Sequence, residues 1–352
     1  MSIPTTQKAL LSNRKGDRLA LTTRPVPSPG PDQVLIKVGG AGLNPHDRDI
    51  RDDGIIVEVW PWVPANDLGG KVVKLGDGVT KYAVGDEIFG QTDFYSMIDH
   101  SGAQEYALMN VKASAKVPSG KSLDDALTLP TNLIAAFWAI HDDSGLHLPL
   151  PGSNWKGKGQ FDFSKHDLLV LGGGSQLGKL TVQVAKLDGW RNIVVNAGLR
   201  NEAELKNLGA THVIDRRLPQ DDQVKQIRKI VGDNLLHTVD TVTDDLTLAV
   251  AALSNSEKGT IVQVREATVD ESKIGNKKAG YNKEFVFGVS TKPSSLPLAQ
   301  EVWAKIPEWV ETGVFKIPEW VIIDGLDADK VNDALDNWRD EKPVPRHVHI
   351  RV

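Results

Sequence analysis

The sequence predicts an α/β fold in two parts, a β-rich lobe followed by a doubly wound parallel sheet. The first 125 residues hold short β-branched runs, such as QVLIKVGGAGL, separated by Gly, Asp and Pro. From Asp167 onward, apolar strand segments alternate with helical segments. Strands that are apolar on both faces require a parallel sheet covered by helices on both sides.

The first lobe is expected to be mostly strands, because GGKVVKLG and GDEIFGQT are also short β-branched runs bounded by Gly or Asp. A helical pattern then covers residues 122–143, with Ser122 as a helix N-cap and carboxylates in the first turn. The Pro-, Gly- and Lys-rich stretch 145–166 is expected to be a surface loop.

The second part has a regular order. Its expected strands are 168–171, 192–195, 212–215, 237–242 and 260–264, and its expected helices are 175–187, 201–208, 223–231 and 245–253. After about Tyr281 the pattern is mixed and ends in the strand-like RHVHIRV. The pentapeptide IPEWV occurs at residues 306 and 317, a duplication too short to indicate a repeat fold. The predicted domains are 1–125, 126–285 and 286–352, the last returning to the first lobe.

Composition narrows the function classes. The chain has 352 residues, a formal net charge of −5 and no cysteine. The charge argues against nucleic acid or an anionic membrane as a partner, and the lack of cysteine excludes disulfides, thiolate nucleophiles and cysteine-ligated zinc. No segment resembles a signal peptide or reaches the roughly 18 apolar residues of a membrane helix. We therefore expect a cytoplasmic protein, as a monomer or homodimer.

The stretch DLLVLGGGSQLGKLTVQVAKL, residues 167–187, joins a strand to a helix through a glycine-rich turn. Glycines let main chain approach a pyrophosphate, and the N–H groups at a helix N-terminus favour negative charge. Such a turn can also merely close a tight bend, but here it opens an alternating strand–helix run, which favours a Rossmann-type dinucleotide site. The predicted phosphate-binding residues are Gly172, Gly173, Gly174, Ser175, Gln176, Leu177 and Gly178.

The end of the second strand predicts which dinucleotide binds. NAD sites usually place a carboxylate there, which accepts from the ribose hydroxyls and repels a 2′-phosphate. This chain has Asn196 at that position, with Arg200 following. A neutral side chain beside a guanidinium favours NADPH as the cofactor. The alternative is that Arg200 is only a solvated residue at the start of a helix.

Motifs along nearly the whole chain resemble one family. They are PVPSPGPDQVLIKV (25–38), GLNPHD (42–47), PANDLGGKVVKLGDGVTKYAVGDEIFG (64–90), GAQEYALM (102–109), LTLPTNLIAA, GGGSQLGKLTVQVAKL and LGATHVID. In this order they resemble the medium-chain dehydrogenase/reductase superfamily. Within it, the chain is similar to the zinc-less, GroES-like fungal branch of quinone oxidoreductases and trans-acting enoyl reductases. The resemblance implies a GroES-like catalytic domain together with a Rossmann NADPH-binding domain.

The resemblance also implies chemistry without a metal. Zinc-bearing relatives have Cys where this chain has Asn44 and His where it has Asn66, and no cysteine is present to replace them. We assign no metal ligand, and zinc-assisted oxidation of a simple alcohol is disfavoured. What remains is hydride transfer to an electrophilic acceptor such as an enone, enal, quinone or enoyl thioester.

Family roles carry over to three segments. The NPHD turn matches a segment at the nicotinamide end of the cleft, which makes Asn44 the best catalytic candidate, with His46 and Asp47 beside it. Asp47 is equally a structural partner, and His46 is often a spectator. The segment Gly198 to Asn201 falls where the fungal branch holds the 2′-phosphate, so Gly198, Arg200 and Asn201 join Asn196 as cofactor residues. Arg216 stands where relatives have a Tyr near the adenine, on which a guanidinium could stack.

The resulting hypothesis is an NADPH-dependent enzyme that transfers hydride to the β-carbon of a conjugated carbonyl, with Asn44 near the developing enolate. Candidate proton donors are Tyr95, Tyr281, His46 and water. Two-electron or one-electron quinone reduction, a non-catalytic NADPH-binding protein and a redox-neutral enzyme are the alternatives. Ala135, where the family often has Thr, and the VPRHVHIRV ending depart from the family pattern and leave the substrate pocket open.

Overall fold

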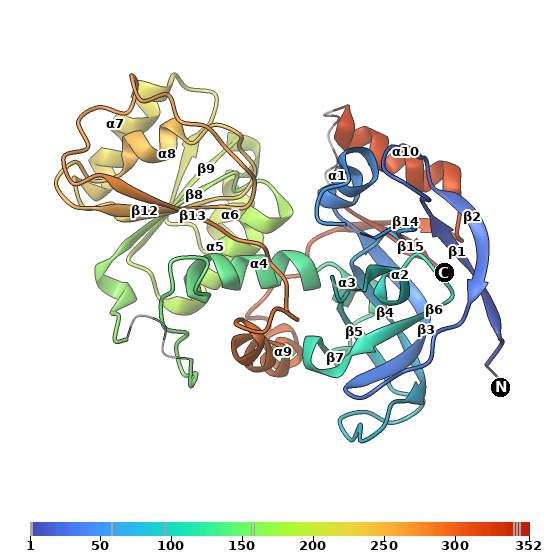
Figure 1. Cartoon of the computed structure of the whole chain (residues 1–352). Helices are drawn as coiled ribbons and strands as arrows, with labels where there is room; N and C mark the ends of the chain where they lie inside the picture. Colours follow the sequence, from blue (N-terminus) through green and yellow to red (C-terminus); the bar gives the residue numbers. More distant parts are fainter. Residues whose placement is uncertain are drawn as a thin grey trace. The chain divides into compact units, whose positions relative to one another are not determined.

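The computed structural model describes residues 3–57, 59–94, 96–155, 157, 159–340, 342, 344 and 346–352. The chain forms two compact units (Figure 1). The first unit is Met1–Thr131 with Val289–Val352, and the second unit is Asn132–Gly288. The domain boundaries predicted from the sequence, after residues 125 and 285, stay a prediction.

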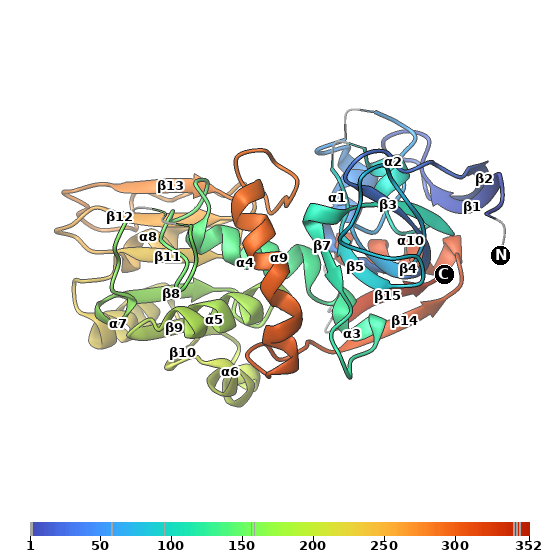
Figure 2. The same cartoon turned by 90° about the horizontal axis from the view of Figure 1, so that it is seen from below.

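The second unit is built on a six-stranded sheet in the order β10-β9-β8-β11-β12-β13 (Figure 2). Every neighbouring pair in it is parallel. From β8 the chain first builds the sheet outward through β9 and β10, and then returns to the other side of β8 with β11. The switch point therefore lies between β8 and β11, and doubly wound sheets bind ligands at such a point. The strands are β8 (Asp167–Leu171), β9 (Asn192–Ala197), β10 (His212–Asp215), β11 (His237–Asp240), β12 (Gly259–Gln263) and β13 (Tyr281–Phe285).

Helices cover this sheet because its strands are apolar on both faces. All five residues of β8 are buried. Leu169 and Val194 pack with Ile227 and Val250 from two helices on one face, while Val195 lies against the glycine-rich turn on the other. The helices are α4 (Pro130–His141), α5 (Gln176–Asp188), α6 (Glu202–Leu208), α7 (Gln220–Val231) and α8 (Thr247–Ala252), with short 3₁₀ turns η2 (Phe163–Lys165) and η3 (Leu199–Asn201).

The first unit is built mainly of β-strands. Its larger sheet has the order β14-β15-β3-β4-β5-β7, with β6 also paired to β3, and β1 and β2 form a separate hairpin. The strands are β1 (Thr6–Leu11), β2 (Ala20–Pro25), β3 (Gln33–Leu43), β4 (Asp67–Leu75), β5 (Glu87–Gln91), β6 (Tyr106–Asn110), β7 (Ser114–Lys116), β14 (Trp320–Asp324) and β15 (His347–Arg351). The helices are α1 (Pro45–Asp53), α2 (Met97–His100), α3 (Leu123–Leu127), α9 (Leu296–Glu311) and α10 (Ala328–Arg339), with the 3₁₀ turn η1 (Val111–Ala113).

The C-terminal strand completes the first unit. β15 runs antiparallel to the end of β3, with Val348 opposite Leu43 and His349 opposite Gly42. On its other edge it pairs with β14 in parallel. Residues more than 300 positions apart therefore meet just before α1, where Asn44 is the N-cap.

Two expectations about local structure need correction. The helical pattern over 122–143 is two helices, α3 and α4. Pro130 has no N–H group and disfavours helical backbone in the residue before it, so the chain breaks there. Ser122 is the N-cap of α3, as predicted. The stretch 145–166 is not purely a surface loop, because Leu146, Leu148 and Phe163 are buried.

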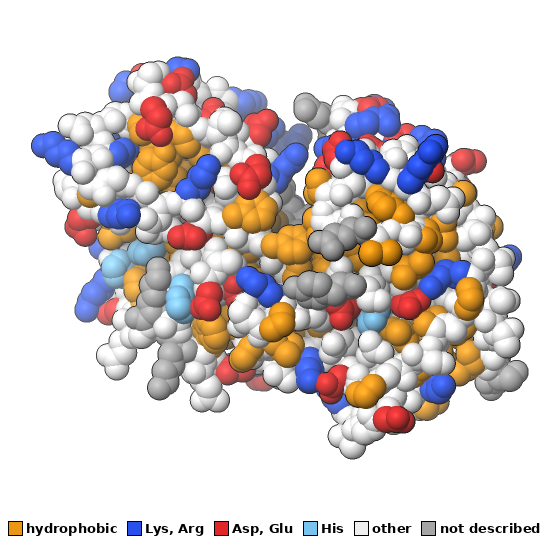
Figure 3. All heavy atoms as spheres, in the orientation of Figure 1, with side chains coloured by type: hydrophobic (Ala, Val, Ile, Leu, Met, Phe, Trp, Pro, Cys, Tyr) orange, Lys and Arg blue, Asp and Glu red, His pale blue; other side chains and the backbone are white. Residues whose placement is uncertain are grey.

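On the face of the molecule in Figure 3, neither positively nor negatively charged side chains gather into one large patch. Lys and Arg side chains alternate with Asp and Glu over the face in Figure 3, as a net charge of −5 leads one to expect. Among the helices that the structure describes, none is long and apolar enough to cross a bilayer.

Candidate functional site

The glycine-rich turn after β8 is shaped by close backbone packing. A Cβ on Gly173 would lie 2.0 Å from Cγ1 of Val195, and one on Gly178 would lie 2.4 Å from the carbonyl oxygen of Gly172. Gly172 itself has a left-handed φ of +75°, a conformation that glycine adopts without cost. The glycines therefore let the start of α5 lie directly against the end of β8.

The start of α5 presents N–H groups that the helix itself cannot satisfy. Ser175 is the N-cap, and its hydroxyl oxygen accepts from the N–H of Gly178 at 2.9 Å. The same hydroxyl lies 3.1 Å from that of Thr241 at the end of β11. Oε1 of Gln176 is buried without a hydrogen-bond partner among the described residues. Unsatisfied donors at a helix start, held at the switch point of the sheet, fit the pyrophosphate of a dinucleotide.

The segment after β9 carries the predicted specificity residues. Asn196 is buried, and its Nδ2 donates to Oε1 of Gln223 on α7 at 2.5 Å, which fixes the amide inside the second unit. Arg200 lies exposed in η3, which Gly198 caps. A Cβ on Gly174 would lie 2.4 Å from Nδ2 of Asn201, so this amide rests on the glycine-rich turn.

Two exposed arginines flank this region without ion pairs. Among the described residues, neither Arg200 nor Arg216 forms a salt bridge, whereas Arg217 holds Asp215 at 3.0 Å. The N–H of Arg216 donates to the carbonyl of Ala197 at 3.1 Å, which ties β10 to the end of β9. Both guanidinium groups thus remain available to an anion.

The predicted catalytic turn forms the start of α1. Asp47 lies at the third position of the helix, where its Oδ2 accepts from the N–H of Asn44 at 2.7 Å. Its Oδ1 accepts from the N–H of Ala65 at 2.9 Å. Burial raises the pKa of Asp47 to about 7 in spite of these two hydrogen bonds. Through these contacts Asp47 joins the backbone of Asn44 to that of Ala65.

Asn44 contacts a second buried carboxyl group. Its Nδ2 donates to Oδ2 of Asp67 at 2.8 Å. Oδ1 of Asp67 accepts from the N–H of Thr131, in the first turn of α4, at 2.8 Å. Asp67 is fully buried, and this burial raises its pKa to about 6. We call the group formed by Asn44, Asp47, Asn66, Asp67 and His347 the Asn44 centre.

His46 lies at the half-buried edge of this centre. Its Nε2 is hydrogen-bonded to Nδ2 of Asn66, and its ring lies 6.1 Å from that of Phe94. Burial lowers the pKa of His46 to about 4. The imidazole is therefore neutral at pH 7, so Nε2 is an acceptor for the Asn66 amide and Nδ1 carries the proton.

The structure adds residues that the sequence reasoning missed. His347 and His349 of β15 lie on the same face of the strand, and His347 contacts Asn44 and Asp67. Asp124 of α3 contacts His349. The alternation HVHIR was a readable signal, since residues two apart on a strand share a face, but the partners of that face come from distant segments.

The other predicted donors lie elsewhere. Tyr95 falls outside the described residues. The hydroxyl of Tyr281, in β13, donates to Oε1 of Glu271 at 2.8 Å. Ala135 packs against Gly288: a Cβ added to Gly288 would lie 2.8 Å from the Cβ of Ala135.

Among the described residues, no group of three His, Cys, Asp or Glu is placed to hold a metal ion.

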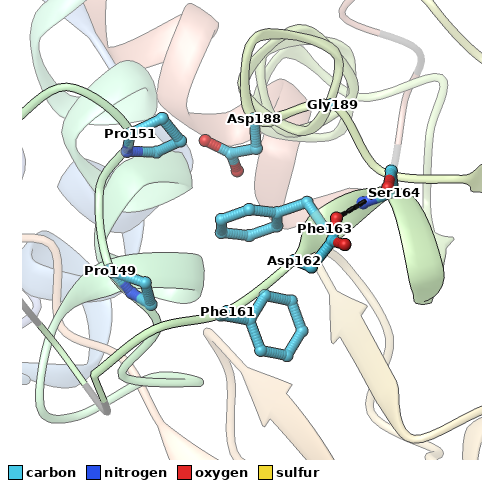
Figure 4. A pocket seen from close by; sticks show the side chains of 8 residues that line it. All are labelled: Pro149, Pro151, Phe161, Asp162, Phe163, Ser164, Asp188 and Gly189. Carbon is cyan, nitrogen blue, oxygen red and sulfur yellow. Dashed lines mark hydrogen bonds between the residues drawn. The ribbon is translucent and has the colours of Figure 1, made fainter.

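A cavity of about 380 Å³ in the second unit lies away from the glycine-rich turn (Figure 4). It is next to Asp188 and Gly189 at the C-terminal end of α5, whereas the turn is at the N-terminal end. A helix of this length separates its ends by roughly 20 Å. The cavity is lined by Pro149, Pro151, Phe161, Asp162, Phe163, Ser164, Asp188 and Gly189.

Two family profiles match this chain. The alcohol dehydrogenase GroES-like domain matches residues 30–119, and the zinc-binding dehydrogenase family matches residues 177–300. Together these segments cover more than half of the chain and both of its units. The chain belongs to the medium-chain dehydrogenase/reductase superfamily. The superfamily and the fold predicted from the sequence motifs are thereby confirmed.

Similar proteins match two thirds or more of the chain. A trans-enoyl reductase from Fusarium mangiferae is 27 % identical, with 97 % of this chain and 99 % of the relative aligned. A chloroplast envelope quinone oxidoreductase homolog from Arabidopsis thaliana is 28 % identical, with 68 % of each chain aligned. The crystal structure of an alcohol dehydrogenase superfamily protein from Novosphingobium aromaticivorans covers 98 % of this chain and 99 % of its own, with a TM-score of 0.78 at 22 % identity.

Membership of the superfamily fixes the general chemistry. The chain is an oxidoreductase of the medium-chain type, as predicted, and its fold implies a nicotinamide cofactor.

Proposed function

We propose that this chain is an NADPH-dependent reductase of conjugated C=C bonds, acting on an enone, enal or enoyl acceptor without a metal ion. The observation that carries the proposal is the Asn44 centre. Two amides, two carboxyl groups and an imidazole line the site. Asn44 contacts Asp47, Asp67 and His347, and Asn66 is bonded to His46 at its edge. Asn44 and Asn66 stand where zinc-bearing relatives have Cys and His, and an amide is not a normal zinc ligand, so the proposed acceptor is one that is already electrophilic.

The choice of NADPH rests on charge. The second strand of the nucleotide sheet ends in Asn196 and Ala197 rather than a carboxylate, and the exposed guanidinium of Arg200 lies four residues beyond Asn196. A 2′-phosphate meets no repulsion there and gains a charge-assisted partner. Gly172 to Gly178 would hold the pyrophosphate, and Gly198, Asn201 and Arg216 the adenosine end.

A reduced nicotinamide dinucleotide, when bound, supplies one hydride to the β-carbon of the acceptor. The chain must then stabilise negative charge on the carbonyl oxygen and provide one proton for the α-carbon. Asn44, fixed by Asp47 and Asp67, is the proposed group beside that oxygen. His46 is neutral and its Nε2 is engaged with Asn66, so it is at most a neutral donor through Nδ1.

Steady-state assays with NADPH against an enone, an enal and a quinone test this function. We expect turnover of the conjugated carbonyls, unaffected by a metal chelator. Turnover of the quinone alone would favour the second candidate, quinone reduction, which the name of the Arabidopsis thaliana relative supports. Tight NADPH binding without turnover of any acceptor would favour a non-catalytic NADPH-binding protein, and loss of activity with the chelator would contradict the metal-free assignment.

A further inference from the structure

Two buried histidines, His347 of the Asn44 centre and His349 next to it, lie in a row. Nε2 of His349 is 2.8 Å from Nδ1 of His347. Nε2 of His347 is 3.4 Å from Oδ1 of Asn44 and 3.6 Å from Oδ2 of Asp67. Nδ1 of His349 is 3.3 Å from Oδ1 of Asp124. His347 is 4 % exposed and His349 is fully buried, so the row is shielded from water between its ends.

The row has an acceptor at each end, and this determines how many protons it holds. Asp124 accepts at the outer end, while Asn44 and Asp67 present oxygens at the inner end, because Nδ2 of Asn44 already faces Asp67. The three contacts along the row need one proton each, but two neutral imidazoles carry only two protons. With both carboxyl groups ionised, the row is complete only when one ring is an imidazolium.

The outer ring is the place for this charge. Oδ1 of Asp124 faces Nδ1 of His349, and Asp124 is itself held by Arg351 at 3.2 Å. The contact with His349 is the first cause that keeps the pKa of Asp124 below its usual value. At the inner end, burial lowers the pKa of His347 well below its ordinary value, so the inner ring disfavours the charge.

The packing around both rings is specific to this arrangement. A Cβ on Gly42 would lie 2.6 Å from Cε1 of His347, so only glycine leaves room for that ring opposite β3. Trp320 of β14 stacks on His349 with ring centroids 6.0 Å apart and an angle of 15° between the planes. Both contacts hold the ring nitrogens in line between Asp124 and Asn44.

We propose that His347 and His349 together store one proton for the reduction and release it to Asp67. The proposal rests on the reductase function above, which consumes one proton for each hydride. In the release, the Nε2–H bond of His349 breaks as an Nδ1–H bond forms on His347. The Nε2–H bond of His347 breaks as an O–H bond forms on Oδ2 of Asp67. One proton moves inward, both rings end neutral, and the reverse movement recharges the pair from the Asn44 side.

Asp67 is suited to receive this proton. Burial raises its pKa to about 6, so the protonated carboxyl group is accessible near neutral pH. The charged and titratable groups around the row come from every element packed on it: Asp124 from α3, Arg351 from β15, Asp324 from β14, Asp67 from β4, and His46 and Asp47 from α1. Arg351 and Asp324 pair with each other at 3.5 Å at the exposed end.

The proton count can be measured without cofactor or substrate. NMR of the ¹⁵N-histidine-labelled protein at pH 7 to 8, with signals assigned through His347→Gln and His349→Gln, reports the protonation of each ring nitrogen. We expect both nitrogens of His349 and Nε2 of His347 to carry protons. Two neutral rings in the wild-type protein would overturn the proposal.

A variant at the outer end sharpens this count. Asp124→Ala removes the outer acceptor, leaving two contacts for two protons, so both rings should become neutral. Asp143→Ala is the matched control, because Asp143 holds the partly exposed His147 at 2.9 Å and its removal should change the signals of His147 alone. An imidazolium that persists unchanged in Asp124→Ala would contradict the storage argument.

The role of His349 in the reduction is tested by enzyme kinetics of a variant. His349→Gln keeps an amide that can donate to Nδ1 of His347 but holds no ionisable proton. We expect its reduction rate with NADPH to fall roughly tenfold or more, its rate to depend on pH differently from the wild type, and its NADPH affinity to stay unchanged. His147→Gln should leave the rate unchanged. A wild-type rate and pH profile in His349→Gln would overturn the proposal. If the wild-type protein reduces none of the acceptors, the reductase function fails, and the ring protonation still decides whether a proton is stored.

Discussion

The glycine-rich turn and the Asn44 centre prepare for a charged ligand in opposite ways. The turn removes side chains, so that the proposed pyrophosphate contacts come from backbone N–H groups at the start of α5. The centre instead buries polar side chains, including Asp47 and Asp67, each of which accepts a hydrogen bond from Asn44. Backbone dipoles are insensitive to pH, whereas buried carboxyl groups are not. The two regions should therefore fail under different changes.

The largest expected effect is a change of stability with pH at Asp47. Burial raises its pKa from 3.8 to about 7, so between these values the folded state holds a proton that the unfolded state has lost. The stabilisation is complete below about pH 4 and is lost as pH rises to about 7, by up to about 4 kcal/mol. Asp47→Asn should lack this loss, so its free energy of unfolding relative to wild type should rise across that range in urea titrations.

Asp125 offers a matched control for this change. It occupies the same position in α3, where its Oδ2 accepts from the N–H of Ser122 at 3.0 Å. Its hydrogen bonds lower its pKa instead, so its contribution is present above the unfolded pKa and is lost as pH falls. Asp125→Asn should therefore shift stability with the opposite dependence on pH. Parallel pH profiles for the two variants would contradict the assignment of Asp47 to a buried, protonating site.

The glycine-rich turn should fail through packing. In Gly178→Ala the new methyl group would lie 2.4 Å from the carbonyl oxygen of Gly172 and 2.7 Å from Cα of Gly173. Both neighbours are backbone, so α5 must shift, at a cost of about 3 kcal/mol. Urea unfolding should show this loss at every pH.

Gly198→Ala is the control for the same substitution. No heavy atom lies within 4 Å of its new Cβ, and its φ is −68°. Its stability should stay within about 0.5 kcal/mol of wild type. Equal losses in the two variants would mean that the contact of the new methyl group with Gly172 does not set the cost.

Sequence reasoning was strongest where structure is local. The β3 run and the turn Gly172 to Gly178 were readable because a strand period and a glycine-rich strand–helix turn are encoded by neighbours. The Asn44 centre was only partly readable: Asn44 was selected through the family resemblance, but Asp67, Thr131 and His347 reach it from three other segments. The pairing of β15 with β3 brings in His347, and the pairing of β4 with β3 brings in Asp67; no local pattern specifies either pairing.

The duplicated pentapeptide makes the same point about fold. IPEWV at residues 306–310 lies within α9, with Ile306 and Val310 buried on one face. At residues 317–321 the same letters lead into β14, where Trp320 pairs with His347. Five residues do not choose between helix and strand; the packing partners do. The same limit applied to the helical pattern that Pro130 divides.

Cofactor preference separates charge from backbone within the nucleotide site. Arg200→Ala should weaken NADPH binding about ten- to a hundredfold, because a charge-assisted hydrogen bond contributes roughly 1.5–3 kcal/mol. The affinity for NADH should change little, because NADH lacks the 2′-phosphate. Calorimetric titration with each dinucleotide measures both.

Arg217 provides the comparison for this arginine. It lies in the same region but is already paired with Asp215 at 3.0 Å, so Arg217→Ala should leave both affinities unchanged. Equal losses of NADPH and NADH in Arg200→Ala would refute the argument from charge and favour a general role for the segment after β9.

The smallest expected effect tests whether the start of α5 acts as a binding surface or only as a helix end. Ser175→Ala removes the cap that accepts from the N–H of Gly178 and should lower stability by about 1 kcal/mol. Asp327→Ala removes the corresponding cap of α10, whose side chain accepts from the N–H of Lys330 at 3.1 Å, with a similar loss. Only Ser175→Ala should also weaken dinucleotide binding, because it alone leaves the turn before α5 less ordered. If both variants lose stability and neither loses affinity, the cap serves the helix and the pyrophosphate contacts come from the glycines alone.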